Sequence, residues 1–147
     1  MENNVIISIK GKQSYEDMED ETIELVTEGR LSRDEGGYTL TYQESELTGL
    51  EGTLTTFQIE PERITLLRIG EVNSQMVFEQ GRRRHLSLYD TPYGSLSVGV
   101  STRKMHAELG LSGGSIEIDY AIEIDHAVAG QNLFQINVRE KRPILQQ

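Results

Sequence analysis

The chain contains no cysteine at any of its 147 positions. This excludes disulfides and thiolate chemistry and agrees with a reducing compartment, so we expect a cytoplasmic protein. No window approaches the 18 apolar residues of a membrane-spanning helix, and the first ten residues lack the basic start and long apolar stretch of a signal peptide. We therefore expect neither a membrane partner nor export.

Basic residues are scarce: 14 lysines and arginines stand against 24 acids, for a formal net charge of −10. Such a chain is repelled by nucleic acid unless its bases cluster, so we expect no nucleic-acid partner. The chain also lacks a Pro/Ser-rich linker, a low-complexity tract and an internal repeat. We predict a single domain over residues 1–147, ordered from about residue 3 to 140 with frayed termini.

Alternation with a period of two is the strongest positive signal. In Ser115–Val128 the even positions from Ile116 to Ile124 are apolar, and most odd positions from Glu117 to Asp125 are acids. This pattern is typical of a strand with one face in the core and the other in water. The same alternation, less regular, predicts strands at Val5–Lys12, Thr22–Arg33, Tyr38–Glu44, Gly52–Glu60, Ile64–Ile69, Gln75–Glu79, Arg83–Tyr89, Ser95–Leu109 and Leu133–Val138.

Short turn signals separate these strands. They stand at 16–21, Asp34–Gly37, Glu60–Glu62, Gly70–Asn73, Gln80–Gly81, Thr91–Gly94, Ser112–Gly114 and Ala129–Asn132. Short connections join antiparallel neighbours, and closing the sheet removes its two exposed edges. We therefore predict an all-β fold: an antiparallel up-and-down β-barrel of eight to ten strands, in meander order.

The apolar phase changes inside Ser95–Leu109, from even positions up to Val100 to odd positions from Met105. One extra residue must enter the strand there, so we predict a β-bulge near Thr102–Lys104. No convincing amphipathic helix appears. Residues Glu44–Gly49 fit either a turn of helix or a longer loop.

A run of three arginines and a histidine precedes an apolar alternation. One phase turns Leu86 and Leu88 into the barrel, carries Arg84 with them and leaves His85 in solvent; hydrophobicity favours this phase. The opposite phase turns His85, Ser87 and Tyr89 inward as a polar pocket lining. A solvated strand end, with its arginines paired to surface acids, is the ordinary outcome for such a run.

Catalytic and metal-binding motifs are missing. The three histidines, His85, His106 and His126, have no zinc-site spacing, and no cysteine completes one. No nucleophile elbow, phosphate loop or metalloprotease helix occurs. We expect no catalytic residue, no metal and no cofactor; an enzyme that uses a histidine at the barrel mouth is the last alternative.

The segment Met76–Gly81 followed by Tyr89–Gly94 resembles the YwiB-like family of small bacterial proteins of unknown function. Supporting pieces are Glu51–Thr53 ahead of Thr55–Ile59, and Leu67–Gly70 ahead of Ser74. The resemblance covers most of the chain and implies a lipocalin-like, or calycin-like, β-barrel. The family brings no established activity, ligand or catalytic residue.

Our leading hypothesis is a non-catalytic binding protein whose barrel interior takes a small amphipathic or anionic ligand. The candidate polar contacts are Arg68, Arg84, His85 and Tyr89, and the candidate apolar lining is Tyr42 and Tyr120. The alternative is a barrel filled by side chains that acts through its surface or as a homodimer. Ile64–Ile69 favours it, because apolar residues occupy both faces of that strand. Alternation alone leaves open whether the barrel is hollow.

Overall fold

A computed structural model of the chain describes residues 2–14, 20–45, 50–70, 73–81, 84–91, 94–124 and 127–141. Every regular element in these ranges is a β-strand. The strands are β1 (Glu2–Ser14), β2 (Glu21–Asp34), β3 (Gly37–Gln43), β4 (Thr53–Ile59), β5 (Arg63–Gly70), β6 (Asn73–Glu79), β7 (Arg84–Thr91), β8 (Gly94–Gly110), β9 (Gly113–Ile124) and β10 (Ala127–Glu140). The predicted all-β fold is confirmed.

All ten strands pair antiparallel with their neighbours along the chain, and β1 pairs with β10 to close the barrel. The closing ladder runs from Val5 opposite Glu140 to Ser14 opposite Gln131. This confirms the up-and-down barrel in meander order.

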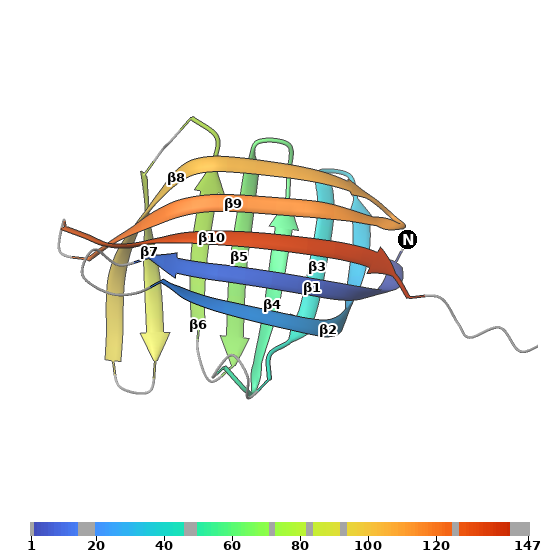
Figure 1. Ribbon diagram of the computed structural model, residues 1–147, viewed down its shortest axis with the longest axis horizontal. Helices are drawn as coiled ribbons and strands as arrows, with labels where there is room; N and C mark the ends of the chain where they lie inside the picture. Colours follow the sequence, from blue (N-terminus) through green and yellow to red (C-terminus); the bar gives the residue numbers. More distant parts are fainter. Residues whose placement is uncertain are drawn as a thin grey trace, which may run out of the picture.

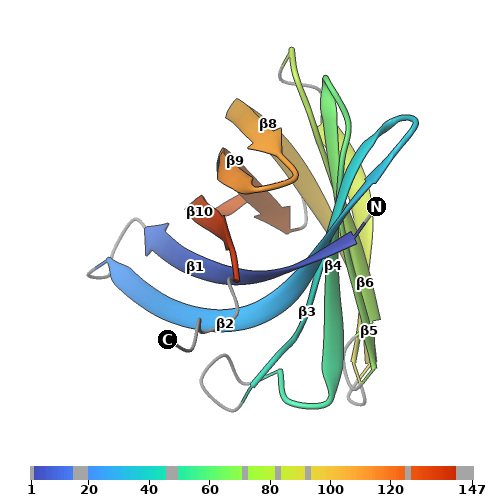
Figure 2. The same cartoon turned by 90° about the vertical axis from the view of Figure 1, so that its right-hand side faces the viewer.

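Two sets of strands of different length build the barrel. β1, β2, β8, β9 and β10 have 12 to 17 residues, whereas β3 to β7 have 7 or 8. The long strands run across the short ones in Figure 1, and in Figure 2 β3 to β6 form one wall opposite β8 to β10. β2 and β8 bend from one layer into the other. The barrel is therefore flattened into two layers with the core between them.

The bend in β8 contains the predicted bulge. Pairing between β8 and β9 shifts register between Thr102 and Lys104, which confirms its position. A second shift lies between Val128 and Gly130 in β10. The turn expected at Ala129–Asn132 is wrong, because β10 already runs through it and the glycine there accompanies a bulge.

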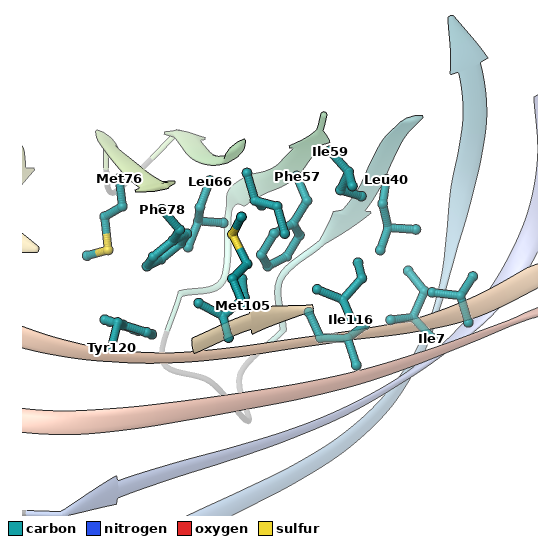
Figure 3. Close-up of a cluster of buried hydrophobic side chains, with 14 of the residues drawn as sticks. Ile7, Leu40, Phe57, Ile59, Leu66, Met76, Phe78, Met105, Ile116 and Tyr120 are labelled. Carbon is teal, nitrogen blue, oxygen red and sulfur yellow. The ribbon is translucent and has the colours of Figure 1, made fainter. Parts of the chain in front are cut away.

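Alternate side chains from the two layers meet between the sheets. Figure 3 shows Phe57, Leu66 and Phe78 from the short strands facing Met105 and Ile116 from the long ones. Most of these side chains are completely buried. The central part of the barrel is thus filled, and burial of this apolar surface is the main source of stability.

The inward orientation expected for Leu86 in β7 is wrong. Leu86 is 70% exposed, whereas Ser87 is buried opposite the buried Val98. Arg84 lies on the outer face, where its Nε donates to Glu123 Oε2 at 2.6 Å. Its guanidinium lies so close to Gly99 that a Cβ there would approach it to 2.8 Å. Hydrophobicity failed here because the ladder to β8 fixes the phase, whatever the composition of β7.

The seam between β6 and β7 is the weakest in the barrel. Among the described residues, pairing there is limited to Asn73 opposite Asp90 and Ser74 opposite Tyr89. Farther along, β6 contacts β8 instead: the Glu79 amide donates to Thr102 Oγ1 at 3.3 Å, and Gln80 Nε2 donates to the Met105 carbonyl at 2.6 Å. Within the described ranges, no helix has the length and apolar content needed to cross a membrane.

Glycine at the β8–β9 hairpin is required by space as well as by φ. Gly114 has φ of +152°, and a Cβ there would lie 1.9 Å from the Glu108 carbonyl oxygen. We predict that Gly114→Ala lowers the free energy of unfolding by about 2 kcal/mol or more. Gly110→Ala is the matched control, because a Cβ there meets no atom within 4 Å. Denaturant unfolding followed by circular dichroism measures both variants, and equal stability of the two would contradict the assigned turn geometry.

Candidate functional site

One end of the barrel interior is hollow. A cavity of about 350 Å³ lies where the long strands extend past the ends of the short strands. It is lined by Ile9, Gly11, Lys12, Gln13, Glu21, Ile23, Leu25, Tyr42, Glu44, Leu50, Arg68, Met76, Tyr120, Ile122, Asn132, Leu133 and Phe134. Most of these residues occupy inward positions of their strands. The barrel is therefore filled at its centre and open at this end.

A row of polar residues crosses the inner face of the short strands at the cavity floor. In the strand registers, Tyr42 lies opposite Thr55, Thr55 opposite Arg68, and Arg68 opposite Ser74. The next residue in the row is Tyr89, whose strand position is described and whose side chain lies outside the described part. Three of the residues predicted from the sequence, Tyr42, Arg68 and Tyr89, thus hold strand positions in one continuous row.

Glu44 completes this floor. It follows β3 directly, and its amide donates to the Thr53 carbonyl at 2.9 Å, which fixes the backbone beside β4. The Glu44 side chain is only 1% exposed, and its Oε2 accepts a hydrogen bond from Thr55 Oγ1 at 2.5 Å. We did not predict Glu44 as a site residue. Its phase was the available signal, because Glu44 continues the inward alternation of Leu40 and Tyr42.

Arg68 faces Glu44 across the floor. Its side chain is 13% exposed, and its Nε lies 3.9 Å from Glu44 Oε2, which is ion-pair distance and too long for a hydrogen bond. Among the described residues, three buried polar atoms have no hydrogen-bond partner: Arg68 Nε, Glu44 Oε1 and Ser74 Oγ. Arg68 and Glu44 line the cavity floor, and Ser74 lies opposite Arg68 in the strand register. Buried polar atoms are nearly always paired, so their clustering indicates a site that a bound molecule completes.

Tyr42 is held in its protonated form. Burial raises its pKa above the ordinary value of 10.0, and both the charge of Glu44 and hydrogen bonding to it act in the same direction. The Arg68 charge opposes the shift only partly. The phenol therefore remains a hydrogen-bond donor beside Glu44.

Aromatic rings form the boundary between the cavity and the filled core. The Tyr120 ring lies 4.7 Å from the Phe78 ring and 5.8 Å from the Phe134 ring, between centroids. Figure 3 shows Tyr120 opposite Met76 and Phe78 at one end of the core. Tyr120, predicted as apolar lining, does lie at the cavity. The walls above it are mainly aliphatic.

Two predicted polar contacts lie away from the cavity. Arg84 is on the outer face with Glu123, as described above. His85 is half-buried at the opened part of the β6–β7 seam, where its Nε2 lies 3.0 Å from Glu79 Oε2. The other Glu79 oxygen accepts a hydrogen bond from Arg63 Nη2 at 2.9 Å. The structure therefore unites Tyr42, Arg68 and Tyr120 and separates Arg84 and His85 from them.

The remaining histidines give no metal centre in the described part of the chain. His106 is exposed beside Glu108, at 3.3 Å, and His126 lies outside the described residues. No three histidine, aspartate or glutamate side chains within the described ranges come together as a possible metal site.

Three other hollows differ from the cavity in kind. A groove of about 460 Å³ on the outer face is bordered by exposed charged residues such as Lys10 and Glu24, which pair with each other at 3.8 Å. A smaller hollow of about 210 Å³ lies at the opposite end of the barrel, near Tyr38 and Leu109. The third, of about 480 Å³, is lined by Ile6, Ser112, Arg139, Glu140 and Lys141. None of the three is lined by Arg68 or Glu44, so the interior cavity is the candidate site.

Comparison with known protein families identifies the family to which the chain belongs. The family model described as a domain of unknown function, DUF1934, matches residues 7–136. The chain belongs to the DUF1934 family. The crystal structure of the YwiB protein from Bacillus subtilis is similar, with a TM-score of 0.85 and 20% sequence identity over 96% of this chain and 94% of that one. At this identity the likeness shows the fold alone. The predicted resemblance to the YwiB-like family is confirmed, and no curated protein matches the chain.

The interaction between Arg68 and Glu44 can be tested by a double-mutant cycle on the free energy of unfolding. We predict that Arg68→Met lowers the free energy of unfolding by about 3 kcal/mol, because it leaves the Glu44 carboxylate buried without its cation. We expect Glu44→Gln to cost about 2 kcal/mol, since solvent in the cavity reaches Arg68. The double variant should lose clearly less than the sum of the two. Denaturant unfolding of the four proteins measures the coupling, and strict additivity would show that the two side chains do not interact.

Proposed function

We propose that this member of the DUF1934 family is a non-catalytic binding protein whose barrel interior takes a small amphipathic or anionic molecule. The observation that carries the proposal is the presence of two unpaired buried atoms, Arg68 Nε and Glu44 Oε1, in residues that line the floor of the cavity. A polar head group at the floor satisfies these atoms, and an apolar body packs along the walls.

The size and lining of the cavity support this proposal. Its volume of about 350 Å³ lies at the lower end of the range, about 300 to 1,000 Å³, of small-molecule sites. Such sites combine mostly apolar walls with a few placed polar groups. Here Ile9, Ile122 and Phe134 supply the walls, and Arg68 and Glu44 supply the polar floor.

The lipocalin-like resemblance and the expected location belong to the same proposal. Barrels of this size often hold one small ligand in their interior. A cysteine-free, acidic chain suits a ligand carrier in the cytoplasm, with neither nucleic acid nor membrane as partner.

Blocking the cavity tests the proposal. Ile23 points into the cavity from β2, so a larger side chain there fills ligand space. We predict that Ile23→Trp weakens binding of Prodan, a small uncharged fluorophore, at least tenfold, which equals about 1.4 kcal/mol. Val26→Trp is the matched control, because Val26 lies on the outer face of the same strand and is exposed. Fluorescence titration measures both; unchanged affinity in Ile23→Trp would place the probe elsewhere.

A homodimer is the second candidate, and one surface favours it. The outer face of β4, β5 and β6 carries a patch of eight uncharged residues: Leu54, Thr56, Gln58, Thr65, Leu67, Ile69, Gln75 and Val77. Ile69 is 63% exposed, and the charged residues at one end of the face, Arg63 and Glu79, pair with each other at 2.9 Å. Because each copy carries a charge of −10, repulsion between two copies is weakest where they meet through such an uncharged patch. A second copy of the chain is thus the occupant we propose for this face.

The homodimer is tested by sedimentation velocity. We predict that Ile69→Lys shifts the protein toward monomer at micromolar concentration, because a lysine on each copy would be desolvated in the interface. Val26→Lys, on a different face, should leave the assembly unchanged. A wild-type protein that is monomeric at micromolar concentration would rule out this second candidate.

A further inference from the structure

The unpaired atoms at the cavity floor specify the head group of the ligand. We propose that the cavity selects an uncharged head group that carries a hydrogen-bond donor beside an acceptor, as in a carboxamide, over a carboxylate or an ammonium of the same length. This inference rests on the proposed function, because it concerns the same cavity.

The pair of opposite charges at the cavity floor is the first argument for an uncharged head group. Arg68 and Glu44 contribute one positive and one negative charge, 3.9 Å apart, and both side chains are largely buried. A carboxylate placed at Arg68 would therefore also lie beside Glu44, and an ammonium at Glu44 would lie beside Arg68. In each case a like charge opposes the attraction where water screens weakly. A net charge on the head group gains little from a floor that is already neutral.

The division of the unpaired atoms into hydrogen-bond donors and acceptors is the second argument for an uncharged head group. Glu44 Oε1 can only accept a hydrogen bond, and Arg68 Nε can only donate one. A carboxylate offers only acceptors and leaves Glu44 Oε1 unpaired, while an ammonium offers only donors and leaves Arg68 Nε unpaired. A carboxamide has its oxygen and its N–H groups on one carbon, so it can satisfy both.

Glu44 is thus the residue that determines specificity. An arginine alone at the floor would select anions, as a guanidinium does elsewhere. The buried carboxylate beside it cancels that preference. Replacing the carboxylate by a neutral amide should restore it.

A matched series of ligands tests the inference. Octanamide, octanoate and octylamine share one chain length and differ only in the head group, and each is titrated against Prodan bound to the full-length protein at neutral pH. We expect octanamide to displace Prodan at least tenfold more tightly than either charged ligand. This ranking in the wild-type protein needs no variant.

Two variants sharpen the test. Glu44→Gln should reverse the order, so that octanoate binds the variant more tightly than octanamide does. Glu35→Gln is the matched control, because it removes the same charge from an exposed residue of the β2–β3 turn outside the cavity and should leave the order unchanged. Circular dichroism verifies that both variants are folded.

The outcomes separate the two proposals. If octanoate or octylamine displaces Prodan as tightly as octanamide from the wild-type protein, the head-group inference is wrong and interior binding stands. The inference also fails if Prodan binds in the cavity and none of the three ligands displaces it. If neither Prodan nor any ligand of the series binds, the proposed function itself is overturned.

Discussion

Closure of a sheet whose strands differ in length is the constraint on which the rest of the structure depends. The β1–β10 ladder removes both edges, so each strand has a partner on either side. Strands of 12 to 17 residues must then bend across strands of 7 or 8. The bulge at Thr102–Lys104 allows this bend in β8. The short strands face only part of the long ones.

The cavity follows from that mismatch. Where both layers face each other, side chains such as Phe57 and Ile116 meet and fill the space. Beyond the ends of the short strands, the long strands continue without an opposite layer, and their inward side chains line a hollow. The polar row from Tyr42 to Ser74 lies at this boundary. Arg68 and Glu44 are thus buried enough to need partners and are still reachable from the cavity.

Much of this arrangement could be predicted from the sequence, because alternation reports which face of a strand is apolar. The strands, their order and the β8 bulge all follow from it. Alternation failed at β7, where the ladder to β8 turns Ser87 inward and Leu86 outward. It also failed over Ser115–Val128, where the apolar pattern continues past the end of β9 at Ile124.

The site itself was only partly predictable. Tyr42, Arg68 and Tyr120 were found through their phase, whereas Glu44 was passed over because an acid at a strand end is usually solvated. Its burial depends on the Thr53 and Thr55 contacts from the neighbouring strand, and those contacts follow from register. A single sequence does not specify the register of strands whose turns are uncertain. The residue that most constrains the ligand was therefore one for which phase was the available signal in the sequence.

Native mass spectrometry of the protein purified from its own host is the measurement that tests the central claim most directly. Our account predicts one small molecule per chain, released on denaturation, with an uncharged polar head and an apolar body, and absent from the Ile23→Trp protein prepared in the same way. A wild-type protein that carries no molecule, and that binds none from a total small-molecule extract of the host, would contradict the claim that a ligand completes the cavity floor.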